Sequence, residues 1–463
     1  MTKRRTLVVN VVGLTADLLR HAPNLKALAA QGGQRPIGPM LPAVTCSVQS
    51  TYLTGLTPAG HGIVGNGWYF RDLSEVMLWK QSNRLVTGEK IWDSAKQRDP
   101  DFTCAQLFWW YNMHSSADYS VTPRPCYTAD GRKIPDIYTQ PADLRGELNA
   151  KLGQFPLFNF WGPRAGIESS RWITDCVLHI LDSRRPSLTL AYLPHLDYDL
   201  QRLGPQHPAI PAAVAAIDDL CGELIAAARK NDMAVIVLSE YGIVPVTGAV
   251  PINRILRQAG LLAVREELGR ELLDPGASEA FAVADHQIAH VYLRDAGRTE
   301  EVRSLLAAQP GVEKVLAGPE KTAAGLDHAN AGDLVLVSSP DRWFSYGWWL
   351  DDAHAPDYAR TVDIHRKPGY DPLELFIDPA IRFPKLAVAW RLAKRALGFR
   401  SLLDVIPLDE TLVRGSHGRP PDDPAHGPLL ISSEPGLLPE STIPATAVKG
   451  VILDHLFSPY PEQ

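Results

Sequence analysis

Short β-branched and apolar runs alternate with amphipathic stretches through the first half of this chain, and this alternation constrains the fold more than any other feature. Four runs predict strands, at residues 7–12, 104–109, 187–192 and 234–238. The clearest helical patterns cover residues 16–30, 169–182 and 209–230. Such alternation is typical of an α/β fold with a mainly parallel sheet covered by helices.

The pattern changes in the second half of the chain. Residues 286–345 follow the order strand, helix, strand, helix, strand, which predicts a compact α+β insertion. Pro and Gly are frequent over residues 404–447, so irregular backbone is expected there rather than a separate domain. We therefore expect a core over residues 1–285, an inserted subdomain over 286–345, and a loop-rich segment over 346–463 that returns to the core.

Composition and charge exclude several classes of protein. Hydrophobic residues make up 45% of the chain and charged residues 21%, the ordinary balance of a globular protein. The net charge of −6 comes from 46 basic and 52 acidic residues spread along the chain, so no nucleic acid polymer is expected as a partner. The five cysteines are odd in number, widely spaced and form no C-x-x-C pair, which indicates reduced thiols and a cytoplasmic location.

Membrane segments are not expected from the sequence. The apolar run over residues 6–14 contains Asn10 and lacks a small-residue cleavage site, so we interpret it as a first strand and not as a signal peptide. No uninterrupted apolar stretch approaches the roughly 20 residues of a transmembrane helix. Residues 384–403 are basic and amphipathic, and we interpret them as a surface helix, with peripheral membrane contact as the alternative.

Polar residues that follow the predicted strands are the candidates for chemistry, because active sites of open parallel sheets lie at the carboxyl ends of the strands. The most informative stretch is Pro42-Ala-Val-Thr45, a helical segment ending in Thr54-Gly55, and Pro58-Ala-Gly-His61-Gly-Ile before Asn66. A hydroxyl at a helix N-terminus meets free backbone N–H groups and the positive end of the helix dipole, which favour a phosphate. The alternative is that Thr45 only caps the helix.

This stretch resembles the nucleophile segment of the nucleotide pyrophosphatase/phosphodiesterase family, within the alkaline phosphatase superfamily. There the pattern is Pro-x-x-Thr, a helix ending in Thr-Gly, then Pro-x-x-His-Gly-Ile and an Asn. The resemblance implies a three-layer α/β/α sandwich and places Thr45 at the nucleophile. Val48 occupies the position of the Asn that holds phosphate in the family, so Gln49 beside it, together with Asn66, is expected to contact the substrate.

Two further segments resemble the metal site nearest the substrate. In Tyr192-Leu-Pro-His195-Leu-Asp197, Asp197 matches the family's Asp, whereas Gln201 stands where the family has a His. Gly415-Ser-His417-Gly resembles the distant segment that supplies the other imidazole of this site, which implies a metal-ligand role for His417. Gln is a much poorer ligand than imidazole because it offers only a neutral carbonyl oxygen.

The second metal site departs further from the family pattern. After the strand at 234–238, Glu240 replaces the family's Asp and Tyr241 replaces its His. Val12, at the end of the predicted strand over residues 7–12, occupies another ligand position. Asn10 lies on the same face of this first strand and could stand in as the ligand. The resemblance thus implies a divalent metal, with zinc one candidate, but two complete zinc sites are not expected. The candidate ligands are Asn10, Asp197, Gln201, Glu240 and His417.

Other polar residues could compensate for the exchanged ligands. The candidate replacement ligands are Asp285, His286, Asp351, His354, Asp363 and His365. Clustered Asp and His suit a metal chemically, although a solvated polar loop is the preferred explanation for any one of them. Arg366 and Lys367 lie beside His365 and are expected to bind an anionic substrate group.

Three functions are compatible with these residues. The first is a phosphoester hydrolase of phosphodiesterase type that acts on a small phosphorylated metabolite through Thr45. The second is a family member that binds a phosphorylated ligand without hydrolysing it, which the exchanged ligands favour. The third is a transferase or mutase that passes the phosphoryl group to an alcohol. The sequence does not indicate an oligomeric state.

Overall fold

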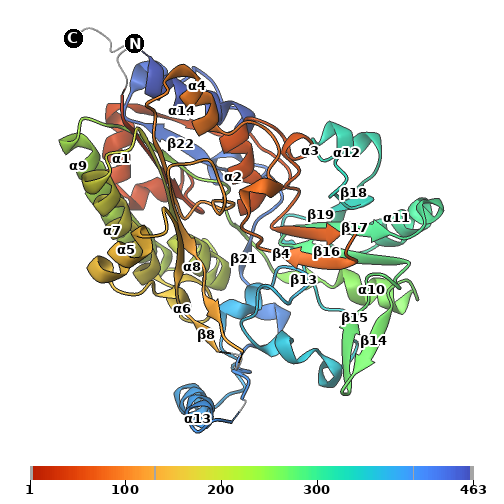
Figure 1. Ribbon diagram of the computed structural model, residues 1–463. Coiled ribbons are helices and arrows are strands. Elements are labelled where there is room, and N and C mark those ends of the chain that lie inside the picture. The colour runs from red at the N-terminus through yellow and green to blue at the C-terminus, as the bar shows by residue number, and fades with distance from the viewer. Residues whose placement is uncertain (1–3, 130–131, 400, 459–463) are drawn as a thin grey trace.

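The computed structural model describes residues 4–129, 132–399 and 401–458 and is built around an eight-stranded sheet (Figure 1). The strand order is β2-β22-β11-β1-β10-β5-β6-β9. Five adjacent strands, from β11 to β6, run parallel, and the outer strands β2, β22 and β9 are joined in antiparallel fashion. Their bounds are β1 Thr6–Val11, β2 Gly33–Pro36, β5 Cys104–Leu107, β6 Tyr119–Pro123, β9 Ile137–Gln140, β10 Leu188–Leu193, β11 Ala234–Leu238 and β22 Leu429–Ser432.

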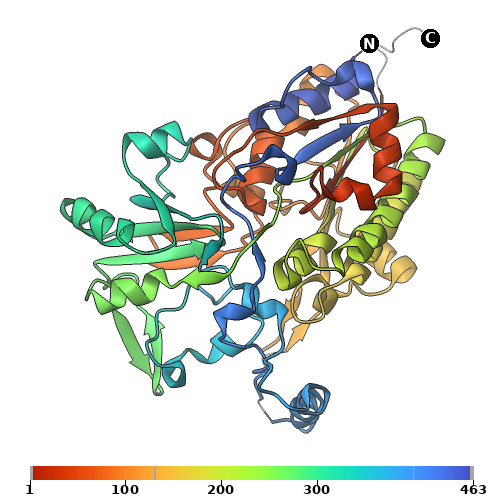
Figure 2. The ribbon, with the colours of Figure 1, turned by 180° about the vertical axis from the view of Figure 1, so that it is seen from behind.

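Helices cover both faces of this sheet, as Figures 1 and 2 show from opposite sides. One layer contains α1 Pro23–Gln31, α7 Ile167–Ser183 and α9 Ile210–Lys230, which pack on one another. The other layer contains α2 Thr45–Thr54, α4 Ile91–Arg98 and α14 Val448–Phe457. The apolar residues of β1, β10 and β11 are fully buried between these layers. The expected three-layer α/β/α architecture is therefore confirmed.

The helix expected over residues 16–30 is divided in two. A 3₁₀ helix covers Leu18–His21, and α1 begins at Pro23. Ala22 has φ −122° and ψ 78°, outside the helical region. The cause is Pro23, whose ring disfavours helical backbone at the preceding residue, so the expectation of one continuous helix was wrong.

A second sheet of four strands lies beside the main sheet (Figure 2). It contains β16 Ala280–Asp285, β17 Ile288–Leu293, β18 Val312–Leu316 and β19 Leu334–Ser338, with α11 Thr299–Ala307 and α12 Pro319–Ala323 between the strands. The order of elements over residues 286–345 is the one the sequence predicts. The first strand, β16, precedes that range, and its turn to β17 carries Asp285 and His286 toward the main sheet. A separate hydrophobic core lies against this sheet.

Shorter elements connect these two units. The remaining helices are α3 Pro58–His61, α5 Leu144–Leu152, α6 Leu157–Phe160, α8 His195–Leu203, α10 Ile252–Gln258 and α13 Pro384–Ala396. The strand pairs are β3 Gly67–Phe70 with β4 Glu75–Leu78, β7 Cys126–Tyr127 with β8 Lys133–Ile134, β12 Val244–Pro245 with β21 Gly415–Ser416, β13 Gly248–Val250 with β20 Arg342–Phe344, and β14 Val264–Glu267 with β15 Arg270–Leu273. All five cysteines are free thiols.

The segment over residues 404–447 is less irregular than its composition indicates. Most of it forms loops and 3₁₀ turns, but β22 enters the main sheet beside β11, with all four residues buried. A four-residue apolar run between turn residues is too short for its pairing to be recognised from sequence. None of the helices that the structure describes has the length and apolar character needed to cross a membrane.

The contact between β21 and α8 generates a prediction. A Cβ atom at Gly415 would lie 2.1 Å from the carbonyl oxygen of Leu200, a backbone atom that cannot move aside. Gly415→Ala should therefore destabilise the fold by about 2–4 kcal/mol, measured by denaturant unfolding. Gly146→Ala in α5 is the matched control, because nothing lies within 4 Å of the added methyl group. Equal stabilities of the two variants would contradict the close packing of β21 on α8.

Candidate functional site

The candidate site lies where three parallel strands end side by side. β1 is hydrogen-bonded to β10 on one side and to β11 on the other, so residues beyond their carboxyl ends meet at one edge of the sheet. Asn10 lies near the end of β1, Asp197 lies on α8 after β10, and Glu240 and Tyr241 follow β11. Thr45 from α2 and His417 after β21 complete the group, and every one of these side chains is buried.

Thr45 is the first residue of α2 and not its cap. The N-cap is Val44, in extended backbone, so the capping interpretation of Thr45 was wrong. The Thr45 hydroxyl lies 3.0 Å from the hydroxyl of Tyr241. The next backbone N–H, of Cys46, donates to Asn66 Oδ1 at 3.0 Å. A hydroxyl is thus held at the amide-rich start of a ten-residue helix, a position that favours an anionic group.

Glu240 is held by two amide side chains. Asn10 Nδ2 and Gln49 Nε2 each donate to Glu240 Oε1 at 2.5 Å. Gln49 is itself fixed, because its Oε1 accepts from the backbone N–H of Trp110 at 2.7 Å. Burial raises the pKa of Glu240 to about 8 in spite of these donors. Asn10 and Gln49 therefore act here as hydrogen-bond donors to a buried carboxyl group.

Asp197 is the second buried carboxyl group. Its Oδ2 accepts from Gln201 Nε2 at 2.8 Å, and its Oδ1 accepts from the Tyr241 hydroxyl at 3.4 Å. Gln201 Oε1 accepts from Tyr370 at 3.0 Å, so Gln201 presents N–H groups and not an oxygen to Asp197. Burial raises the pKa of Asp197 to about 7. This orientation gives Gln201 no free oxygen for a cation.

His417 offers an unused nitrogen to the same place. Its Nδ1 donates to the carbonyl oxygen of Ala43 at 2.8 Å, which leaves the lone pair on Nε2. Nε2 is buried without a hydrogen-bond partner and lies 3.9 Å from Asp197 Oδ1. Burial lowers the pKa of His417 to about 3, so the imidazole is neutral at ordinary pH. A neutral imidazole facing a carboxylate is the usual donor pair for a divalent metal.

The ring of His417 belongs to a buried stack of four rings. The ring centroids of Tyr241 and His417 are 3.6 Å apart, those of His417 and His286 are 3.6 Å apart, and those of His286 and Tyr370 are 3.7 Å apart. His286 occupies the turn between β16 and β17 with φ 62°, a left-handed conformation uncommon for residues other than Gly. Tyr370 could not be predicted as part of the site from the sequence, because its place depends on tertiary packing alone.

Asn66 is positioned from the second sheet. Its backbone N–H donates to Asp285 Oδ2 at 2.7 Å and its Nδ2 donates to Asp285 Oδ1 at 3.0 Å. Its side-chain Oδ1 accepts from the backbone N–H of Cys46, so both the oxygen and the nitrogen of the side-chain amide form hydrogen bonds. Burial raises the pKa of Asp285 to about 6. Asp285 and Asn66 thus orient the first turn of α2.

The other candidates lie in a different set of contacts. Lys367 is buried between Asp371, at 2.7 Å, and Glu374, at 2.8 Å, so its charge is compensated there. Arg366 is largely exposed and pairs with Asp357 and Asp363.

The remaining replacement candidates also have partners of their own. Asp351 caps a 3₁₀ turn, His354 lies 3.9 Å from Glu271, and His365 lies 3.4 Å from the carbonyl oxygen of Leu78. Among the described residues, no hydrogen bond or ion pair joins any of them, or Arg366 and Lys367, to Asp197, Glu240 or His417. The polar contacts of these residues therefore lie outside the group around Thr45.

The unpartnered atoms of the site test whether a metal suits it. Glu240 Oε2, Asn10 Oδ1 and His417 Nε2 are buried without partners, and all three are acceptors. No lysine or arginine contributes to the pKa shift of Asp197 or Glu240. Surplus acceptors without a positive charge fit a cation. However, within the described ranges no three His, Cys, Asp or Glu residues converge as a metal-binding group. Asp197 and His417 are therefore two donors that suit a cation, without a third His, Cys, Asp or Glu beside them in the described part of the chain.

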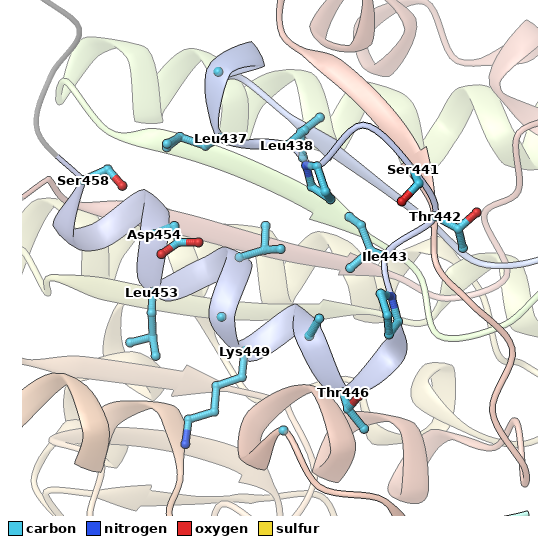
Figure 3. A pocket seen from close by; sticks show the side chains of 17 residues that line it. Leu437, Leu438, Ser441, Thr442, Ile443, Thr446, Lys449, Leu453, Asp454 and Ser458 are labelled. Carbon is cyan, nitrogen blue, oxygen red and sulfur yellow. The ribbon is translucent and has the colours of Figure 1, made fainter.

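A surface hollow lies away from this site (Figure 3). It has a volume of about 720 Å³ and lies between α14 and residues 436–447, with Gly55 at its margin. Gly55 follows the last residue of α2, whereas Thr45 is the first, and a ten-residue helix is about 15 Å long. None of the residues that line this hollow belongs to the candidate site.

The raised pKa values predict a pH dependence of stability in protein freed of metal by a chelator. The pKa of Glu240 is higher in the folded chain than in the unfolded chain, so its contribution is fully present below about pH 4.5 and is lost as pH rises through about 8. The Glu240→Gln variant keeps an acceptor oxygen but cannot ionise, so it does not lose this stability as pH rises. The variant should exceed wild type in stability at pH 9, by an order of a few kcal/mol, and approach it at pH 4.5. A constant difference across thermal unfolding experiments at these pH values would contradict the shift.

The chain resembles proteins of known structure over its full length. The phosphonoacetate hydrolase of Sinorhizobium meliloti, solved with phosphonoformate, has a TM-score of 0.61 at 16% identity and covers 98% of this chain and 100% of its own. Murine ectonucleotide pyrophosphatase/phosphodiesterase 5 has a TM-score of 0.57 at 14% identity and covers 98% of this chain and 95% of its own. At these identities the similarity establishes the fold.

Sequence comparisons add the family. A Schizosaccharomyces pombe protein described as an uncharacterized pyrophosphatase/phosphodiesterase is 27% identical over 252 residues, 52% of this chain. That match spans 44% of the yeast protein, less than half of its length. Residues 6–371 match the family described as type I phosphodiesterase / nucleotide pyrophosphatase. These names indicate hydrolase chemistry of the phosphodiesterase and pyrophosphatase type. The chain belongs to the type I phosphodiesterase/nucleotide pyrophosphatase family.

Proposed function

We propose that this chain hydrolyses a phosphodiester of a small phosphorylated metabolite, with Thr45 as the nucleophile. The observation that carries the proposal is the chain of hydroxyl groups that joins Thr45 to Asp197. Thr45 Oγ1 lies 3.0 Å from the Tyr241 hydroxyl, which lies 3.4 Å from Asp197 Oδ1. This arrangement connects an alcohol at a helix start to a buried carboxyl group that can accept its proton.

The residues support a two-step reaction. The Thr45 oxygen attacks phosphorus, one ester bond breaks, and the leaving alcohol takes up a proton; water then cleaves the Thr45 phosphoester. Tyr241 relays the Thr45 proton toward Asp197, whose Oδ1 is within reach of the Tyr241 hydroxyl. The first turn of α2, oriented by Asn66 and Asp285, binds the phosphate oxygens.

A divalent cation belongs to this proposal because no hydrogen bond or ion pair of the described residues brings a lysine or arginine to Asp197 or Glu240. Asp197 and His417 would hold it, with Glu240 as a further oxygen donor, and zinc is one candidate. Such a cation neutralises charge that develops on the phosphate.

Substitution of the nucleophile is the direct test. Thr45→Ala should lower turnover of a p-nitrophenyl phosphodiester at least about a thousandfold, because a methyl group cannot attack phosphorus. Thr54→Ala, the same change at the other end of α2, should retain activity once circular dichroism shows both variants folded. Undiminished turnover in Thr45→Ala, assayed with several divalent metals, would eliminate Thr45 as the nucleophile.

Metal content provides a separate prediction. Asp197→Ala and His417→Ala should each reduce bound metal at least about tenfold in elemental analysis, because each removes one of two strong donors. Asp199→Ala is the matched control, since Asp199 pairs with Arg202 on α8. Full metal occupancy in both site variants would place the ligands elsewhere, and Asp351, His354, Asp363 and His365 would be tested next.

A non-hydrolysing binding protein is the second candidate. It is favoured by the amide side chains of Asn10, Gln49 and Gln201, which donate hydrogen bonds to carboxylate oxygens that a metal would otherwise use. Calorimetry with inorganic phosphate and AMP, beside turnover assays on a panel of phosphoesters, separates the two functions. Binding without metal and without turnover in the wild-type protein would favour this candidate over the hydrolase.

A further inference from the structure

Helix α13 projects from the rest of the molecule (Figures 1 and 2). Several of its large apolar side chains are exposed. Phe383, Leu386, Trp390 and Leu397 recur at spacings of three, four and seven residues, which places them on one side of a helix. Phe383 is 61% exposed, Leu386 68%, Trp390 59% and Leu397 73%. Phe399 and Leu402 extend this exposed apolar surface beyond the helix.

The opposite side of α13 fixes the orientation of this face. Val388 packs on a small hydrophobic cluster that includes Val246, Trp343 and Leu373. Arg391 forms a salt bridge with Asp404 and donates to the carbonyl oxygen of Ala387. The helix is thus attached to the body by Val388 and Arg391, and the face of Leu386 and Trp390 is directed to solvent.

Positive charge surrounds the apolar face. Residues 379–403 contain six basic residues and no acidic one, although the whole chain has a net charge of −6. Arg382 lies over the ring of Phe383 at 5.4 Å, and Lys394 lies over the ring of Trp390 at 5.3 Å. Aromatic rings with cations at their edges suit the boundary between lipid headgroups and acyl chains.

We propose that α13 and its flanking residues form a membrane-binding site for anionic phospholipids, with the helix lying in the plane of the interface. The 13-residue helix is too short to span a bilayer, and its apolar side chains would enter only the outer boundary of the acyl chains. The basic residues would contact lipid phosphates. Contact with a second copy is disfavoured, because it would bring the basic residues of positions 379–403 in one chain against those of the other.

Vesicle co-sedimentation tests this proposal with the intact chain. Wild-type protein should bind phosphatidylcholine vesicles containing about 30% phosphatidylglycerol at least about tenfold more strongly than pure phosphatidylcholine, and salt should weaken the binding. Leu386→Ser with Trp390→Ser, and separately Lys385→Glu with Lys394→Glu, should each reduce binding at least about tenfold. These side chains are exposed, so circular dichroism should show unchanged folding.

Matched variants distinguish a local site from general stickiness. Leu73→Ser with Leu268→Ser removes exposed leucines elsewhere, and Lys26→Glu with Lys230→Glu reverses exposed charges elsewhere. Both controls should bind like wild type. The proposal is overturned by absence of binding, by equal binding to neutral and anionic vesicles, or by equal losses in the controls. A dimer seen by light scattering would also overturn the proposal, if the double variant Leu386→Ser with Trp390→Ser dissociates it and the wild-type protein does not bind vesicles.

Discussion

The parallel pairing of β1 with β10 and β11 is the constraint on which the site depends. In this register Asn10 lies opposite Tyr192 on one side and Leu238 on the other, so all three strands end at one edge. Asp197 and Glu240 follow those ends and approach the same space although 43 residues separate them in sequence. Their burial raises the pKa of both and requires amide, hydroxyl or metal partners for their oxygens.

Strong local patterns explain why much of the fold could be predicted from sequence. β11 covers the predicted residues 234–238, and α9 differs from its predicted range by one residue, because apolar periodicity decides both. The segments around Thr45, Asp197, Glu240 and His417 could be placed together by resemblance to a family. The ring stack of His286 and Tyr370 could not, because it depends on a turn in one sheet that meets a loop from elsewhere.

Charge patterns were less informative about the site. Arg366 and Lys367 are adjacent to His365 and suit an anion, but Lys367 has its carboxylate partners four and seven residues later in the chain. Sequence proximity does not show whether a buried lysine is already paired. The role of the exchanged residues Gln201 and Tyr241 could not be predicted either. Their hydrogen bonds to Asp197 become clear only from the orientation of their polar atoms.

The stack of four rings has a mechanical consequence. Tyr241 follows β11 of the eight-stranded sheet, whereas His286 is at the tip of a hairpin in the four-stranded sheet. The ring of His417 lies between the rings of these two residues, and its carbonyl oxygen accepts from the Gln287 backbone N–H in the same hairpin turn. Asp285 at the same tip holds Asn66 and, through it, the start of α2. A shift between the two sheets would therefore pull apart the rings and rotate the amide beside Thr45 in one movement. The candidate site around Thr45 can therefore be no more rigid than the junction between the two sheets.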